Sequence, residues 1–308
     1  MINYALSQVE DKEIQGVLEY VLGLSEKHVT FLTDLCKKGK LAVPDGFSTE
    51  DVNLHAPRLF TDDFFIMYIQ NLGKIGLTAY SKALSNAARS DIVQYFKQCL
   101  TSSAELLEKS IEVKLSKGIF ARAPFIPKQE KVQYVEKQHY MGGGWFSEKR
   151  PLNAIEITHL YYNIERNHLG IVLIIGFSQV AHSKEVQQYM YRGRDISRKY
   201  VEVFSELLRD DYLAVSSAWD VQATGSTKSP FSDKLMMFHI NTMNASGIGQ
   251  YGASIGMSQR ADLVVMYTRL VAEIGKFAVD GANIMINNGW MEKPPQAIDR
   301  KQIAKGKG

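Results

Sequence analysis

Residue types that point to particular classes of protein are scarce in this chain of 308 residues. Its two cysteines, Cys36 and Cys99, are too few and too isolated for a disulfide framework or a thiolate metal site. The 36 lysines and arginines exceed the 33 aspartates and glutamates by only three, which gives no sign of a nucleic-acid partner. The longest apolar run, Leu169–Phe177, has about half the length of a membrane crossing, and the N-terminus has no apolar export segment. We therefore expect a cytoplasmic protein with reduced thiols and no membrane span.

Proline and alternating apolar patterns are also scarce. The eight prolines lie in loops or near the ends of apolar-periodic segments, and no stretch has several alternating runs separated by turn residues. Residues 92–115 instead repeat apolar side chains at three- and four-residue steps, and Gly118 then stands where a helix C-terminal glycine belongs. Residues 233–255 and 262–286 are free of proline and too long for strands. The sequence predicts an all-α fold.

A shift of 171 residues aligns the two halves of the chain without a gap. The aligned identical pairs are Phe60/Phe231, Asp62/Asp233, Ile69/Ile240, Gly76/Gly247, Tyr80/Tyr251, Arg89/Arg260, Asp91/Asp262, Gly118/Gly289 and Pro124/Pro295. Upstream, Ser7–Val9 matches Ser178–Val180 at the same shift. These pairs mark helix starts, helix ends and one helical stripe in the same order, which indicates an internal duplication.

Each copy has room for four helices, and four amphipathic helices with mostly short connections make a four-helix bundle. The expected helices are residues 2–11, 12–39, 58–86 and 88–117 in the first copy, and 152–182, 184–210, 230–257 and 259–289 in the second. We divide the chain into a first bundle (1–117), a linker (118–151), a second bundle (152–291) and a basic, solvated tail (292–308).

The linker contains prolines and Gly142–Gly144, which rule out a continuous helix. It also contains five aromatic residues that we expect to pack along the bundles: Phe125, Tyr134, Tyr140, Trp145 and Phe146.

The first bundle lacks most of its first helix. About 25 residues precede the Ser-Gln-Val mark within the second copy's first helix, whereas only six precede it in the first copy. We expect the apolar groove that remains to be filled by the linker, by the other bundle or by a partner chain. The run Leu169–Phe177 is apolar on all sides, which predicts a helix buried between bundles or between subunits.

Gly247, Gly249 and Gly252 spell the G-x-G-x-x-G pattern of dinucleotide-binding loops. That pattern works only between a strand and a helix, and here it falls inside an expected helix, so we exclude the nucleotide interpretation. We expect these glycines to allow the close approach of a neighbouring backbone.

Glu156 and His159 form a Glu-x-x-His pattern, which places a carboxylate and an imidazole on the same helical face, as in di-iron bundles. Glu202, His239 or Glu273 would complete a mononuclear iron or manganese site. The competing interpretation is a polar pair near a helix start, with no cofactor.

The repeated Arg-x-Asp, Arg89/Asp91 and Arg260/Asp262, begins the fourth helix of each copy. An acidic residue there favours the helix dipole, and an arginine can bind loop carbonyls or a facing carboxylate. Asp62 and Asp233 stand at the start of the third helix, as caps or first-turn acids. We interpret both sets as architectural, with an anion site at the arginines as the alternative.

The chain resembles domain-of-unknown-function family 3231 of spore-forming Gram-positive bacteria. The resemblance runs along nearly the whole chain and rests on residues 45–65 (DGFSTEDVNLHAPRLFTDDFF), 150–163 (RPLNAIEITHLYYN), 176–186 (GFSQVAHSKEV), 229–239 (SPFSDKLMMFH) and 280–300 (DGANIMINNGWMEKPPQAIDR). It implies a tandem pair of ferritin-like, up-down four-helix bundles. Relatives look longer at the start by roughly the missing first helix, so either the start of this sequence was assigned late or the first bundle is open. Some relatives carry the label of spore coat protein, and the resemblance supplies no established reaction.

We therefore expect a non-enzymatic structural or binding protein, associated with spores and with itself or another spore-related protein. The alternative is a metal-binding, ferritin-like oxidoreductase or storage module that uses Glu156 and His159.

Overall fold

The structure, a computed structural model, describes residues 1–142, 149–215 and 222–306, and these residues form helices and connecting loops with no strand. The α-helices are α1 (Ile2–Gln8), α2 (Lys12–Lys38), α3 (Asp62–Asn86), α4 (Ser90–Ser116), α5 (Ala154–Val180), α6 (Lys184–Asp210), α7 (Asp233–Met257), α8 (Ala261–Asn287) and α9 (Arg300–Ala304). Short 3₁₀ turns occupy Thr49–Asp51 and Gln138–Met141. The all-α prediction is confirmed, and the eight expected helices are present, with ends that lie up to four residues inside the expected ranges.

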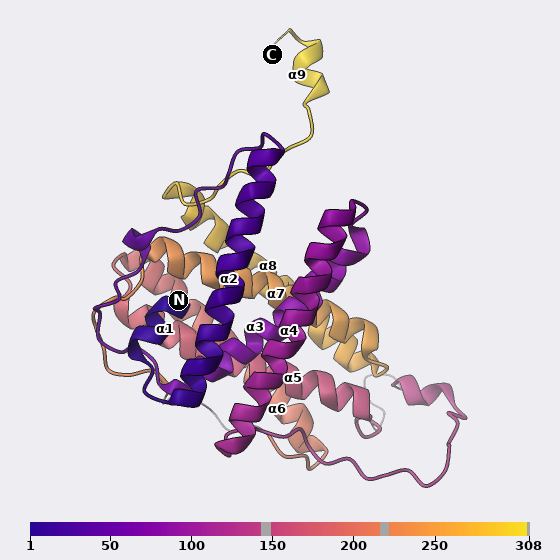
Figure 1. Cartoon of the computed structure of the whole chain (residues 1–308). Helices are drawn as coiled ribbons and strands as arrows, with labels where there is room; N and C mark the ends of the chain where they lie inside the picture. The colour runs from indigo at the N-terminus through magenta and orange to yellow at the C-terminus, as the bar shows by residue number, and fades with distance from the viewer. Residues whose placement is uncertain (143–148, 216–221, 307–308) are drawn as a thin grey trace.

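The helices form two tandem bundles, α1–α4 and α5–α8 (Figure 1). Helix α1 has 7 residues, whereas its counterpart α5 has 27, so the first bundle does lack most of its first helix. Within the residues that the structure describes, no helix is long and apolar enough to cross a membrane.

In each bundle the third helix caps the second through an aspartate. The Asp62 carboxylate accepts hydrogen bonds from the backbone N–H groups of Glu10 and Asp11, at 3.2 and 2.8 Å. The Asp233 carboxylate accepts from His182 and Ser183 at 3.0 and 2.8 Å. These bonds satisfy amide groups at a helix start that have no partner inside their own helix. Thr61 and Ser232, one residue earlier, are the N-caps of α3 and α7 themselves.

The loops that precede α3 and α7 pair with each other. Val52 bridges to Phe231, and Phe60 bridges to Ala223. At the shift of 171, Ala223 is the counterpart of Val52 and Phe231 is the counterpart of Phe60, so the two bridges are equivalent to each other. The hydroxyl of Tyr68 lies 3.3 Å from Nδ1 of His239, which is its own counterpart at the same shift. A residue that meets its counterpart lies on a symmetry axis. The two halves are therefore related by an approximate two-fold axis that passes between these two side chains.

One part of the alignment needs a correction. Helices α3 and α4 correspond to α7 and α8 at a shift of 171, but α2 corresponds to α6 at 172, as do the ends of α1 and α5. The connection between α2 and α3 is one residue longer than that between α6 and α7. The match of Ser7–Val9 to Ser178–Val180 at 171 was therefore out of register by one residue.

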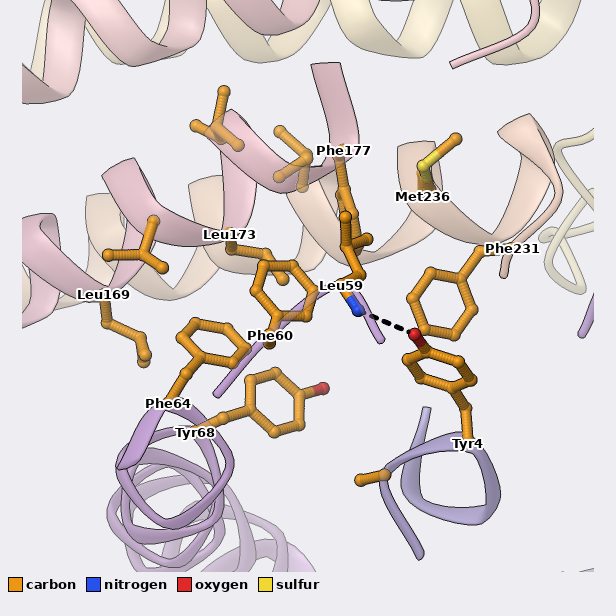
Figure 2. Close-up of a cluster of buried hydrophobic side chains, with 14 of the residues drawn as sticks. Tyr4, Leu59, Phe60, Phe64, Tyr68, Leu169, Leu173, Phe177, Phe231 and Met236 are labelled. Carbon is orange, nitrogen blue, oxygen red and sulfur yellow. Dashed lines mark hydrogen bonds between the residues drawn. The ribbon is translucent and has the colours of Figure 1, made fainter. Parts of the chain in front are cut away.

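The largest apolar core draws on both bundles (Figure 2). Phe60, which is fully buried, stacks on Phe64 with 4.2 Å between ring centroids and meets the ring of Phe177 edge-on at 6.3 Å. Tyr4 of α1 packs edge-on against Phe231 at 5.1 Å and accepts a hydrogen bond from the backbone N–H of Leu59. The second bundle thus fills the inner part of the groove left by the short α1. The predicted burial of Leu169–Phe177 is confirmed, since most of this run lies in the shared core.

Two expectations about local packing were wrong. Gly249 and Gly252 face open space, with no atom within 4 Å of where a Cβ would stand, and Gly247 approaches a side chain, that of Ile274, instead of a backbone. In the linker, Phe125 and Tyr134 are more than 80% exposed and do not pack along the bundles. Tyr140 does pack, under the guanidinium of Arg150. Gly143, Gly144, Trp145 and Phe146 lie outside the described residues.

Mild acid is expected to destabilise the protein through His239. Burial lowers the pKa of this ring from 6.5 to about 4, so between these values the folded protein keeps it neutral while the unfolded chain takes up a proton. The free energy of unfolding therefore falls as the pH drops from 6.5 towards 4, by about 1–3 kcal/mol after allowance for the partial exposure of the ring. Urea unfolding at pH 7 and pH 4.5 measures the loss, and His239→Gln should lose less. Equal losses in both proteins would contradict this assignment.

Candidate functional site

The start of α5 is held in place by a buried carboxylate, that of Glu156. Its Oε1 accepts hydrogen bonds from Nη2 of Arg150 at 2.8 Å and from the backbone N–H groups of Gln259 and Arg260 at 3.1 and 2.9 Å. Its Oε2 accepts from Nη1 of Arg150 at 2.8 Å and from the backbone of Asn153 at 3.0 Å. Five N–H groups thus donate to one carboxylate, which caps the N-termini of both α5 and α8.

A second ion pair, between Arg260 and Asp262, lies beside this cap. The guanidinium of Arg260 donates to both oxygens of Asp262, at 3.1 and 2.8 Å, and to the carbonyl of Arg150 at 3.1 Å. Burial alone would raise the pKa of Asp262, but bonds from Arg260 and Lys149 outweigh it and lower that pKa to about 2. The pKa of Glu156 is also lowered, because the bonds from Arg150 outweigh the effect of burial. Both carboxylates are therefore ionised at neutral pH, and the guanidinium donors are used within the chain.

The segment before α5 closes the outer end of the second bundle. The backbone N–H of Leu152 donates to the carboxylate of Asp211, directly after α6. Leu152 then joins Ile157, Leu160 and Ile164 in a second apolar core with α6, α7 and α8. Residues 150–164 thus join the starts of α5 and α8 through Glu156, meet the end of α6 through Leu152, and add an apolar stripe to the second core.

His159, on the same turn of α5 as Glu156, has a different partner. Its Nδ1 lies 3.0 Å from the hydroxyl of Ser254, and burial lowers its pKa. The other candidate ligands also have partners elsewhere, since Glu202 pairs with Arg209, and Glu273 with Lys199. No group of three or more histidine, cysteine, aspartate or glutamate side chains in the described ranges has the arrangement of a metal site.

The interior of the second bundle beyond His159 is polar. The side-chain amide of Asn163 donates to Ser254 at 3.0 Å, and that of Asn167 donates to the hydroxyl of Tyr251 at 2.8 Å. A cavity of about 50 Å³ follows, lined by residues that include Asn167, Asn244, Tyr251 and Arg166. This volume suits a few water molecules, and amide and phenol groups are suitable partners for them.

The corresponding end of the first bundle is open. Arg89, the counterpart of Arg260, donates only to Asp91 at 2.7 Å, and its side chain is 64% exposed instead of 6%. No carboxylate among the described residues accepts from the backbone N–H groups of Ala88 and Arg89, which correspond to the two N–H groups that Glu156 caps in α8. A cavity of about 220 Å³ lies here, between the end of α2 and the start of α4. Its lining residues are Phe31, Asp34, Leu35, Lys38, Gly39, Arg89 and Asp91.

Apolar side chains of the same outer half are incompletely covered. We call the surface formed by Leu32, Tyr80, Ile92 and Phe96 the open face. Leu32 is 45% exposed and the other three are partly exposed, and none of them belongs to either core. Their counterparts in the second bundle are at most 1% exposed: Phe204, Tyr251, Leu263 and Tyr267. The difference is the outer half of α5, which belongs to the same core as the second set and has no equivalent over the first set among the described residues.

The sequence singled out Glu156 as a candidate metal ligand, and in the structure its carboxylate accepts five N–H hydrogen bonds. Asn153 and Glu156 form a capping box, a pattern readable from their Asn-x-x-Glu spacing. Arg150 carries no sequence signal, because its role depends on a contact between the linker and α5. The short first helix of the first bundle was an indirect sequence signal of the open face.

The sequence was compared with known proteins. Residues 1–132 and 140–303 match a family described as "Protein of unknown function (DUF3231)", which is therefore present twice. A comparison with the curated proteins finds no match. Among solved structures, a crystal structure described as that of a "putative spore coat protein" from Bacillus halodurans C-125 is similar, with 18% identity and a TM-score of 0.46. The similarity covers 49% of this chain and 98% of the other.

Proposed function

The chain belongs to the DUF3231 family of proteins of unknown function, and we propose that it is a non-enzymatic binding protein that assembles with a partner protein through its open face. The observation that carries the proposal is the contrast between Phe96, partly exposed, and its counterpart Tyr267, which is fully buried. An exposed apolar surface whose counterpart in the other bundle is fully buried is typical of an interaction site.

The energetic reason is the cost of leaving this surface in water. Full burial of a large apolar side chain is worth about 1.5–3 kcal/mol, so covering four partly exposed ones offers several kcal/mol to a partner. The second bundle obtains this stabilisation from α5, whereas no described residue covers the open face of the first bundle in the same way.

The alternative function is a ferritin-like module that binds iron or manganese through Glu156 and His159. It has less support because the two oxygens of Glu156 already accept five hydrogen bonds, and a metal would have to displace Arg150 or the start of α8. His159 points to a hydroxyl, which is a poor companion ligand.

We infer that the protein is located in the cytoplasm, and as a finer proposal that it associates with spores. This finer proposal rests on the resemblance to a family of spore-forming bacteria. A tagged chain followed through sporulation tests it, and a chain that stays outside the spore fraction would count against it.

Photo-crosslinking at the open face tests the proposed assembly. A photoreactive residue at position 32, in the full chain expressed in its own cells, should yield a covalent product with a second protein. The same residue at Val265, which is 60% exposed on α8, is the matched control and should yield none. Phe96→Lys should abolish the product formed from position 32. Absence of a product at position 32, or an equal product at Val265, would contradict the proposed function.

A further inference from the structure

We propose that the open face receives an amphipathic helix of a partner protein, about four turns long, whose first turn places an acidic side chain against the start of α4. This inference rests on the proposed function and specifies the chemistry of the partner. Its basis is the second bundle, where the equivalent position is occupied within the same chain.

The outer half of α5 shows what such a helix must supply. Residues 154–168 form about four turns, and their buried apolar side chains include Ile157, Leu160 and Ile164, at steps of three and four. This spacing is that of one helical stripe. A helix that covers Leu32 and Phe96 needs the same stripe, because these residues correspond to the Phe204 and Tyr267 that the stripe covers in the second bundle.

The start of α4 specifies the acidic residue. In α8, the N–H groups of Gln259 and Arg260 donate to the carboxylate of Glu156, which lies in the first turn of α5. In α4 the corresponding N–H groups belong to Ala88 and Arg89. The positive end of the α4 dipole favours a carboxylate at this point, while the guanidinium of Arg89 pairs with Asp91, as that of Arg260 pairs with Asp262. The partner helix therefore enters with its N-terminus at the start of α4.

A second copy of this chain is a less suitable source of the helix. Helices α2–α8 each use an apolar face within a bundle, and α1 lies in the shared core. The remaining helix, α9, projects away from the bundles (Figure 1) and has only five residues. It carries Arg300 and Lys301, whereas the start of α4 calls for an acid.

A peptide binding experiment with the purified full chain tests the inference. The probe is a fluorescent synthetic peptide of residues 150–168, the segment that fills the equivalent position in the second bundle. Fluorescence anisotropy should show saturable binding, about tenfold weaker for the peptide with Glu156→Gln, since a charged acceptor for backbone N–H groups is lost. Binding should disappear in the chain with Phe96→Lys, and Val265→Lys should leave it unchanged. Circular dichroism checks that both variants remain folded.

The outcomes separate the two proposals. Absence of saturable binding, or binding that persists in Phe96→Lys, overturns the helix inference, and the crosslinking result at position 32 then decides the proposed function alone. Equal binding of the wild-type and Glu156→Gln peptides overturns the acidic first turn. Sedimentation that reveals a dimer abolished by Phe96→Lys, with no peptide binding, assigns the open face to a second copy and overturns the partner helix.

Discussion

Replacing Glu156 by alanine is expected to destabilise the protein by about 3–5 kcal/mol, the range observed when one partner of a buried ion pair is removed. The substitution leaves five N–H groups without their acceptor, among them both Nη groups of Arg150 and the first amides of α8. The melting temperature should fall on the order of 10 °C, which differential scanning calorimetry measures directly. The second bundle should open first, because this carboxylate joins α5 to α8.

The matched control is Glu202→Ala, which removes a carboxylate that pairs with an arginine at the surface. Glu202 and Arg209 are both more than half exposed, so this loss should leave the melting temperature nearly unchanged. Similar effects of the two substitutions would show that the cap is not structural. Metal analysis of the wild-type chain and of a variant with Glu156→Ala and His159→Ala completes the test. Stoichiometric iron or manganese in the wild type alone would favour the metal-binding alternative.

Adding one methyl group at Gly176 is expected to cost about 1–3 kcal/mol, despite the higher helix propensity of alanine. A Cβ at this position would overlap Cε1 and Cζ of Phe60 and would lie 3.5 Å from Cγ of Leu59. The ring of Phe60 cannot move aside, because it is fully buried between Phe64 and Phe177. Gly176→Ala therefore disturbs the junction of the two bundles, and urea unfolding should show the loss.

Gly249→Ala is the control, since it makes the same chemical change inside α7, where no atom lies within 4 Å of the added carbon. Here the helix propensity acts alone, and the free energy of unfolding should rise by up to about 1 kcal/mol. A stabilising effect at both positions would mean that the two bundles do not meet closely at Phe60.

The sequence predicted the features that depend on local periodicity. The apolar steps of residues 92–115 gave α4, and the uninterrupted run Leu169–Phe177 gave the helix at the junction of the bundles. Repeated residues such as Asp62 and Asp233 located helix starts because both copies need the same cap.

Features that depend on contacts between distant segments could not be read in the same way. The contacts of Glu156 and of Arg150 with the start of α8 join residues more than 100 positions apart. The exposure of Phe125 and Tyr134 was not predicted, because an aromatic side chain in a linker has no periodic neighbours that would indicate what covers it. The difference between the open end of the first bundle and the closed end of the second can be recognised only when the structures of the two halves are compared.

The contact between Tyr68 and His239 has a consequence for the history of the chain. Before the gene doubled, both positions belonged to one residue type, and that side chain would have faced its own copy across an isologous homodimer. The contact between the two halves of this chain therefore corresponds to an interface between two identical subunits, and the open face marks a place where the described halves now differ.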